Sequence, residues 1–423
     1  MVKILGGFFL LLTIAVPIAV TLAILTFWGL LEADISPLAA LQSSMESLDS
    51  FSLMAIPFYI LAGNIMQAGG ISERLVGLAN AIIGWVRGGL GAAAVLTSMF
   101  FATISGSSSA TTAAVGTITI PAMVRKGYPK PFAAAAVASA GELGVIIPPS
   151  LPMIVYALVM NMSAADLFLA GVLPGLMIGF SLIATIIVVS NLMGFDTVAK
   201  VSPRQWLRGV FTAIKGAGPA LLMPVLILGG IYSGTFTPTE AAVVASVYGF
   251  LVSVFVYKQM RFADMAQVLM RSALTSAGLL LIVAFASAFG FLLTINQVPH
   301  QVGLWISAVA SSAVTFLLLV NLLLFVVGMF METLAAIIIL APILGPVAAQ
   351  YGIDPVHFGM IMIVNLATGM VTPPLGVNLF VVCEVAKLRI DQLTKPLLIF
   401  LGVLIVNIMI VTQVPSISLM LLK

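Results

Sequence analysis

The sequence predicts an all-α protein that crosses a membrane many times and is built from two inverted repeats. Of its 423 residues, 61% are hydrophobic and only 7% are charged, whereas a soluble domain carries roughly a quarter charged residues. Apolar runs of about 18–20 residues, long enough to cross a bilayer core, recur along the whole chain. The same landmarks also occur twice in the same order, and each half contains a polar interruption of an apolar run.

The composition excludes several classes of function. No long polar segment suggests a separate soluble domain, and no G-x-x-x-x-G-K-[ST] loop suggests nucleotide binding. The net charge of +3 comes from short basic connections, which orient membrane proteins, so we expect membrane lipids as neighbours and no nucleic acid partner. The single cysteine, Cys383, excludes an internal disulfide. Because no nucleotide-binding loop is found, any energy-requiring function must draw on something other than bound ATP.

Ten segments are predicted to enter the membrane, and 71–86 is the marginal one. They are residues 4–31, 51–68, 71–86, 131–161, 167–193, 216–232, 240–257, 272–293, 357–386 and 396–414. Basic residues gather in connections that we assign to the cytoplasm. They are Arg125, Lys126, Lys130, Lys200, Arg204, Arg208, Lys215, Lys258, Arg261, Arg271, Lys387, Arg389 and Lys395. The predicted outer loops, 233–238 among them, lack Lys and Arg, and the alternation then places the acidic loop 32–49 in the cytoplasm.

Two stretches do not fit a simple span. Residues 87–126 run apolar, meet a hydroxyl cluster at 105–112, and run apolar again between two basic sites. Both ends should therefore lie on the same side, as in a re-entrant helical hairpin whose tip opens inside the membrane. Residues 303–350 repeat this pattern with a tip at 328–333 and uncharged flanks, so the second hairpin should enter from outside.

Each hairpin precedes a helix that is broken near its middle by a double proline. Matching landmarks in the two halves are spaced by 221 to 226 residues. The pairs are Pro121 and Pro342, Pro131 and Pro355, Phe132 and Phe358, Gly144 and Gly369, and Pro148-Pro149 and Pro373-Pro374. Inverted repeats of this kind are common in secondary transporters.

The predicted first repeat is residues 1–213 and the second is residues 214–423. The first contains scaffold helices in 1–86, a hairpin at 87–126, a broken helix at 130–162 and a helix at 166–193. The second contains scaffold helices in 214–293, a hairpin at 303–350, a broken helix at 355–387 and a helix at 394–415.

The interruptions predict binding chemistry, because irregular backbone at membrane depth is tolerated only where it lines a cavity or binds a ligand. Helix C-termini there offer carbonyls to a cation, and helix N-termini offer amides to an anion. The hydroxyl residues at 107–112 and Thr333 are predicted helix caps, and Thr372-Pro373 a predicted helix start. The residues predicted to bind sodium are Ser105, Ser107, Ser108, Gly144, Val145 and Pro148 at one site, and Gly328, Thr333, Gly369 and Thr372 at the other.

A bound carboxylate would lie beside these ions. The residues predicted to contact it are Ser108, Ser109, Thr111, Pro149, Glu332, Thr333, Pro374 and Asn378. Because no Lys or Arg falls at a predicted midplane position, the carboxylate should be neutralised by amide dipoles and co-bound sodium. Anion affinity should then depend on sodium, and sodium affinity on the anion.

Simpler interpretations remain for each feature alone. Gly and Ser clusters also serve close helix packing, and proline pairs also serve as kinks. Their recurrence in both halves favours binding. Glu142 and Glu332 have either a direct role in the site or a structural hydrogen-bonding role, whereas Glu240 is interpreted as a helix cap.

The hydroxyl cluster and the segment 141–150 resemble the large membrane subunit of the tripartite ATP-independent periplasmic (TRAP) transporters. The second half is similar to that family at Gly328, Glu332, Thr333, Pro342, Asn365, Gly369 and residues 372–378, and the resemblance covers essentially the whole chain. It implies a bacterial inner-membrane, sodium-coupled, elevator-type carrier that is not an enzyme. It also implies a separate small membrane subunit, a periplasmic substrate-binding protein, and a small carboxylate such as a C4-dicarboxylate or sialic acid as substrate.

Three alternatives stand beside this interpretation. A stand-alone sodium/dicarboxylate symporter of related fold would have no binding-protein gene nearby. An intramembrane serine protease built on Ser107 would need a histidine at matching depth, and His300 and His357 fall near predicted helix ends. A pure scaffold protein would not need two pairs of broken helices.

Overall fold

The computed structural model describes residues 6–8, 10–11, 14, 16–196 and 202–422, and this part of the chain is helical without a β-strand. Among these residues, eight helices are long and apolar enough to cross a membrane, or nine if one bent pair counts as a span. The all-α, multi-span prediction is confirmed. Part of the predicted segment 4–31, and Lys200, lie outside the described residues.

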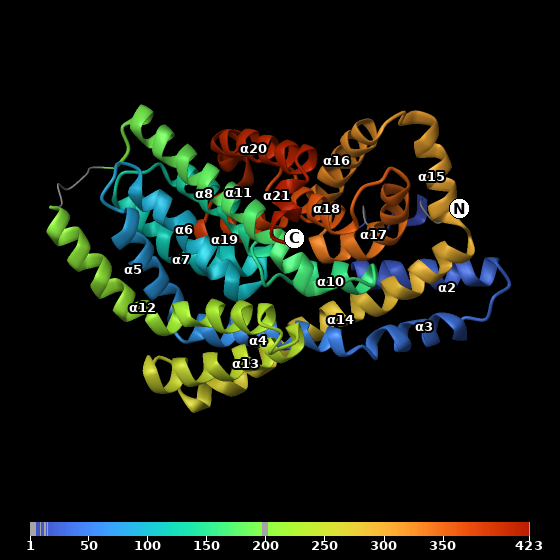
Figure 1. Cartoon of the computed structure of the whole chain (residues 1–423), viewed down its shortest axis with the longest axis horizontal. Coiled ribbons are helices and arrows are strands. Elements are labelled where there is room, and N and C mark those ends of the chain that lie inside the picture. The colour runs from blue at the N-terminus through green and yellow to red at the C-terminus, as the bar shows by residue number, and fades with distance from the viewer. Residues whose placement is uncertain (1–5, 9, 12–13, 15, 197–201, 423) are drawn as a thin grey trace.

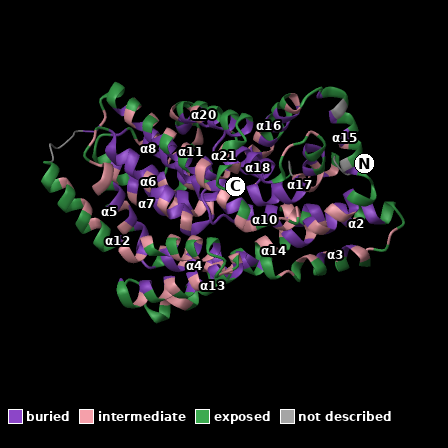
Figure 2. Cartoon of the chain, viewed as in Figure 1, coloured by how far each residue is buried: buried purple, intermediate pink, exposed green. Residues whose placement is uncertain are grey.

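One layer of the molecule, which we call the scaffold layer, contains the first helices of each half. It comprises α2 (Ile18–Glu32), α3 (Leu38–Leu48), α4 (Ala55–Ala68), α5 (Ile71–Ile83), α12 (Pro203–Tyr232), α13 (Pro238–Leu251) and α14 (Met265–Ile295). Figure 1 shows α3, α4, α13 and α14 along the lower edge of the molecule. α14 packs against α2, α3 and α4, and α4 packs against α13. Many outward-facing residues of this layer are exposed apolar side chains, as lipid contact requires (Figure 2).

Hydroxyl groups fix the direction of α4 against α13. Thr239 donates to the carbonyl of Phe51 at 3.1 Å, and two further bonds follow seven and fourteen residues later in both helices, from Ser246 to Phe58 and from Ser253 to Ile65. The two helices are therefore parallel, and residue 51 lies at the same end as the predicted outer loop 233–238. The predicted cytoplasmic side of loop 32–49 and the predicted outer side of loop 233–238 are not both compatible with this arrangement, and the sidedness of each loop stays a prediction.

The other layer holds the hairpins and broken helices, and we call it the core layer. It comprises α6 (Gly89–Ser105), α7 (Ser108–Arg125), α8 (Lys130–Gly141), α9 (Leu143–Ile146), α10 (Leu151–Val159), α11 (Ala164–Met193), α16 (Ala313–Phe330), α17 (Thr333–Gln350), α18 (Pro355–Gly369), α19 (Val377–Ala386) and α20 (Ile390–Gln413). Helix α15 (Val298–Val309) leads into the second hairpin, and α21 (Ser416–Leu419) follows α20. The predicted range 303–350 thus divides into the end of α15 and the two arms α16 and α17.

Two helices lie at the centre of the core layer. Residues 132–141 of α8 and 356–369 of α18 are all buried, and Figure 2 shows buried residues concentrated in this central part of the molecule. The alanines of α8 permit this burial, since small side chains let neighbouring backbones approach closely.

The two halves exchange contacts in a matched way. The second arm of the first hairpin, α7, packs against α19, which follows the second double proline. The second arm of the other hairpin, α17, packs against α10, which follows the first double proline. Both Pro-Pro bonds, at 148–149 and 373–374, are cis. This exchange agrees with a two-fold repeat, and the boundaries of the repeats stay a prediction.

Candidate functional site

The tip of the first hairpin is a two-residue break between α6 and α7. Gly106 has φ +59°, in the left-handed region that favours glycine. Ser107 is extended, and its hydroxyl accepts a hydrogen bond from the amide of Ala110 at 3.4 Å, which makes it the N-cap of α7. The predicted cap at the start of α7 is therefore confirmed.

Three oxygens gather at this tip. The Ser105 and Thr111 hydroxyls lie 2.8 Å apart, and the Thr111 hydroxyl donates to the Ser107 carbonyl at 2.8 Å. The Ser105 hydroxyl also lies 3.3 Å from that carbonyl. These are hard, uncharged oxygen ligands of the type that small alkali and alkaline-earth cations take in proteins.

The tip packs directly against the first broken helix. A Cβ on Gly144 would lie 2.4 Å from the Ser107 carbonyl oxygen, so only glycine permits the observed backbone approach. The amide of Leu151, the first residue of α10, donates to the Gly106 carbonyl at 3.3 Å. On the other side, the Asn378 amide of α19 donates to the hydroxyl of Ser108.

The second tip repeats the close approach with different side chains. A Cβ on Gly369 would lie 2.5 Å from the Cα of Gly328. The cap of α17 is Glu332, whose side chain makes no capping bond, so the prediction of Thr333 as the cap was wrong by one residue. The Thr333 hydroxyl instead points to the Met370 sulfur at 3.0 Å.

The predicted helix start at Thr372-Pro373 was also wrong. Helix α19 begins at Val377. The Thr372 hydroxyl donates to the carbonyl of Thr368 at 2.9 Å, so this side chain continues the turn that ends α18.

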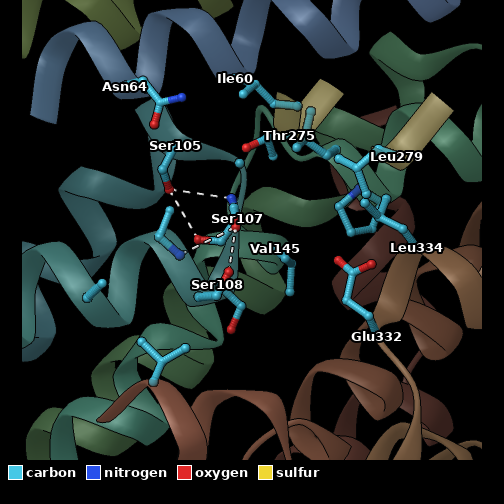
Figure 3. Close-up of a pocket in the computed structure, with 18 of the residues that line it drawn as sticks. Ile60, Asn64, Ser105, Ser107, Ser108, Val145, Thr275, Leu279, Glu332 and Leu334 are labelled. Atoms are coloured by element: carbon cyan, nitrogen blue, oxygen red, sulfur yellow. Dashed lines mark hydrogen bonds between the residues drawn. The ribbon is translucent and has the colours of Figure 1, made fainter. Parts of the chain in front are cut away.

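Both tips meet a single cavity of about 400 Å³ between the core layer and the scaffold layer. Figure 3 shows the serines of the first tip on one side, Glu332 and Leu334 of the second tip on the other, and Asn64 and Thr275 of the scaffold layer above them.

Helix ends determine the chemistry of this cavity. Helices α7, α10 and α17 begin in its wall, and α6, α9 and α18 end in it or next to it. Each N-terminus carries about half a positive elementary charge, and each C-terminus a similar negative charge. The cavity can therefore accommodate an anion and a cation side by side.

The structure brings some of the predicted residues to the cavity and leaves others behind it. Those in the wall are Ser105, Ser107, Ser108, Ser109, Val145 and Glu332. Those packed behind the two tips are Thr111, Gly144, Gly328, Thr333, Gly369, Thr372 and Asn378. Pro148 and Pro149 lie in the break before α10, and exposed Pro374 is not among the residues lining the cavity. The assignment of sodium and substrate ligands stays a prediction.

Sequence reasoning missed the scaffold wall, which contains Asn64 and Gln67 of α4 and Arg271 and Thr275 of α14. We expected Arg271 in a loop, but α14 begins six residues before it. The apolar segment of 34 residues that contains α14 measures about 51 Å, longer than the ~30 Å hydrocarbon core, so its basic end extends beyond the apolar region. The prediction that no Lys or Arg lies at a midplane position did not anticipate this basic side chain in the cavity wall. The i, i+4 spacing of Arg271, Thr275 and Leu279 was the available signal.

A family model, "Tripartite ATP-independent periplasmic transporter, DctM component", matches residues 5–417. The chain belongs to this family. It is 45% identical to the C4-dicarboxylate TRAP transporter large permease protein DctM of Pseudomonas aeruginosa over 374 residues, covering 88% of this chain and 87% of the relative. It is 36% identical to the 2,3-diketo-L-gulonate TRAP transporter large permease protein YiaN of Escherichia coli, covering 99% and 97%.

Another relative is the isethionate TRAP transporter permease protein DctMQ of Oleidesulfovibrio alaskensis, at 43% identity over 97% of this chain and 65% of the relative. A solved structure, the YdaH transporter of Alcanivorax borkumensis, superimposes with a TM-score of 0.63 at 18% identity and covers 88% of this chain and 87% of that chain. That likeness shows the fold alone.

Membership identifies the chain as a multi-pass inner-membrane subunit of a TRAP transporter, which is not an enzyme. In this family the large permease works with a small membrane subunit and a periplasmic binding protein. The family match therefore favours the tripartite interpretation over a stand-alone symporter.

Proposed function

We propose that this chain is the translocating subunit of a sodium-coupled importer for a small organic carboxylate, with a C4-dicarboxylate as the first candidate. The relatives from Pseudomonas aeruginosa, Rhodobacter capsulatus and Vibrio cholerae named for C4-dicarboxylates support this candidate. Sialic acid and similar acids are the further candidates, because other relatives carry those names. A periplasmic binding protein delivers the acid, and a separate small membrane subunit completes the complex.

One observation carries the proposal, the convergence of three helix N-termini and three C-terminal ends on one cavity. The amides at the starts of α7, α10 and α17 suit a carboxylate. The oxygens of Ser105, Ser107 and Thr111 suit a sodium ion close to it. Each ligand lowers the electrostatic cost of binding the other, which makes their binding reciprocal.

An elevator movement is the mechanism we propose for crossing. The hairpins and broken helices pack on one another within the core layer, and the cavity lies at its boundary with α4 and α14. Sliding of the core layer against the scaffold layer carries the cavity from one side to the other while its helix ends keep their arrangement.

The test is uptake of succinate into proteoliposomes that hold both membrane subunits, with binding protein outside and an imposed sodium gradient. We expect uptake to require the gradient. Equal uptake after replacement of sodium by potassium would contradict sodium coupling. If other organic acids are taken up and succinate is not, the C4-dicarboxylate is excluded as the substrate.

Two substitutions test the sodium residues in the same assay. Ser107→Ala and Thr372→Ala should each raise the sodium concentration needed for half-maximal uptake. Ser312→Ala is the matched control, because Ser312 also caps a helix, accepting from the amide of Thr315 at 3.2 Å, but on an exposed surface. Sodium activation identical to wild type in both test variants would refute their assignment.

A further inference from the structure

We propose that Arg271 on the scaffold layer binds the second carboxylate of a doubly charged substrate while the core layer holds the first. This inference rests on the proposed function and specifies how a dicarboxylate is distinguished from a singly charged acid. It assigns a role in the binding site to a residue outside the hairpins and broken helices.

Charge is distributed unevenly around the cavity. Of the described residues that line it, Arg271 and Glu332 are the two with ionisable side chains, and they belong to opposite layers. Glu332 lies beside the amides at the start of α17. Arg271 forms no ion pair within the described residues, although the nearby Asp264 is paired with Arg261 at 3.1 Å. The scaffold wall thus presents to the cavity a guanidinium that is not held in an ion pair within the described residues.

The neighbours of Arg271 are suited to a polar ligand. Asn64, Gln67 and Thr275 line the same wall and offer neutral hydrogen-bonding groups. The Asn64 amide donates to the hydroxyl of Ser272 at 2.9 Å, which fixes α4 to α14 next to Arg271. A guanidinium on a fixed helix can bind a carboxylate through two parallel hydrogen bonds, which a point charge cannot do.

A second cavity of about 240 Å³ extends this wall toward the start of α14. It shares Asn64, Gln67 and Arg271 with the larger cavity and also contacts Gln267 and Asp264. Arg271 therefore lies at the junction between the two cavities. By the positive-inside rule, this end of α14 faces the cytoplasm, which places Arg271 on the release side.

The layers also make this contact dependent on the state of the transporter. The amides at the starts of α7, α10 and α17 belong to the core layer, whereas Arg271 belongs to the scaffold layer. If the core layer slides, both carboxylates can be held only while the tips face Arg271. The residue then raises affinity for a dicarboxylate in the state seen here.

The test measures binding to the purified complex of this chain and its small subunit, in nanodiscs at saturating sodium. The two probes are succinate and monomethyl succinate, which differ by one negative charge. We expect wild type to bind succinate more tightly, and Arg271→Gln to weaken succinate about tenfold while changing the monoester little, since a charge-assisted hydrogen bond is worth about that factor. Arg271→Lys should retain part of the preference.

Arg204→Gln is the matched control, because Arg204 is an exposed arginine of the scaffold layer that lines neither of these two cavities. It should change neither affinity. An unchanged preference in Arg271→Gln, or an equal loss of both probes, would overturn the inference while leaving sodium-coupled transport intact. If wild type binds neither probe, the C4-dicarboxylate assignment fails and the inference fails with it.

Discussion

Gly144→Ala should impair sodium binding by displacing the first hairpin tip. The added Cβ would lie 2.4 Å from the Ser107 carbonyl oxygen and 2.5 Å from the Thr111 hydroxyl oxygen, whereas ordinary contacts begin at 3.4 Å. The closest atom is backbone, so no flexible side chain can move aside. The tip and α9 must therefore separate by about 1 Å, the difference between 3.4 Å and 2.4 Å.

That displacement is large on the scale of ion coordination, where ligand distances vary by only about 0.2 Å. We expect the sodium affinity to fall at least about tenfold, because one or more oxygens leave the coordination shell. Overpacking of this size also lowers stability by about 1–3 kcal/mol, so the variant should still fold.

The assay is the sodium dependence of the thermal unfolding temperature of the complex, followed by sodium titration of succinate uptake. Gly402→Ala is the control, because no atom lies within 4 Å of the added Cβ and alanine favours the helix by about 1 kcal/mol. Gly402→Ala should keep the wild-type sodium response. A Gly144→Ala protein with the wild-type sodium midpoint would refute the argument that tip and α9 form the ion site together.

Two further predictions concern buried hydroxyl and amide groups. Thr111→Val keeps the shape of the side chain but removes the hydroxyl that donates to the Ser107 carbonyl. It should lower the free energy of unfolding by about 1–3 kcal/mol and raise the sodium concentration needed for half-maximal uptake. Thr117→Val, at an exposed position of the same helix, should change neither quantity. Asn365→Leu should destabilise by about 0.5–1.5 kcal/mol in chemical denaturation, because the Asn321 Oδ1 loses its 3.0 Å bond from Asn365 and keeps the 3.3 Å bond from Thr412. The double variant with Asn321→Leu should cost less than the sum of the two single variants, and additive costs would contradict the pairing.

The fold was predictable because the membrane restricts the alternatives. Hydrocarbon allows spanning structure to be helical, so apolar runs give the number and place of most crossings. Residues 51–68 were predicted as a span and are found as one. Charge counting did not determine the direction of α4 relative to α13, because the preceding loop 32–49 contains no Lys or Arg. Three hydrogen bonds from hydroxyl groups of the α13 segment to carbonyls of the α4 segment determine this direction, and a local sequence pattern does not predict them.

The candidate site was predictable where backbone geometry determines it. Gly106, Gly144 and Gly369 stand where the chain requires a left-handed turn or a backbone approach closer than a Cβ allows. The N-cap of α17 was not determined by the sequence, because Glu332 and Thr333 are both polar and adjacent. The sequence pattern locates the second tip but does not select which of these two residues is the cap.

The scaffold wall was missed for a different physical reason. Arg271 was assigned to a loop because charge in an apolar sequence usually ends a span, yet a helix longer than the hydrocarbon core can carry an arginine at its polar end. Whether that side chain faces lipid headgroups or the cavity depends on the rotation of α14. This rotation is fixed by packing against α2, α3 and α4 and by the Asn64 bond to Ser272. Contacts between distant segments therefore decide which layer supplies the positive charge, and a local pattern cannot.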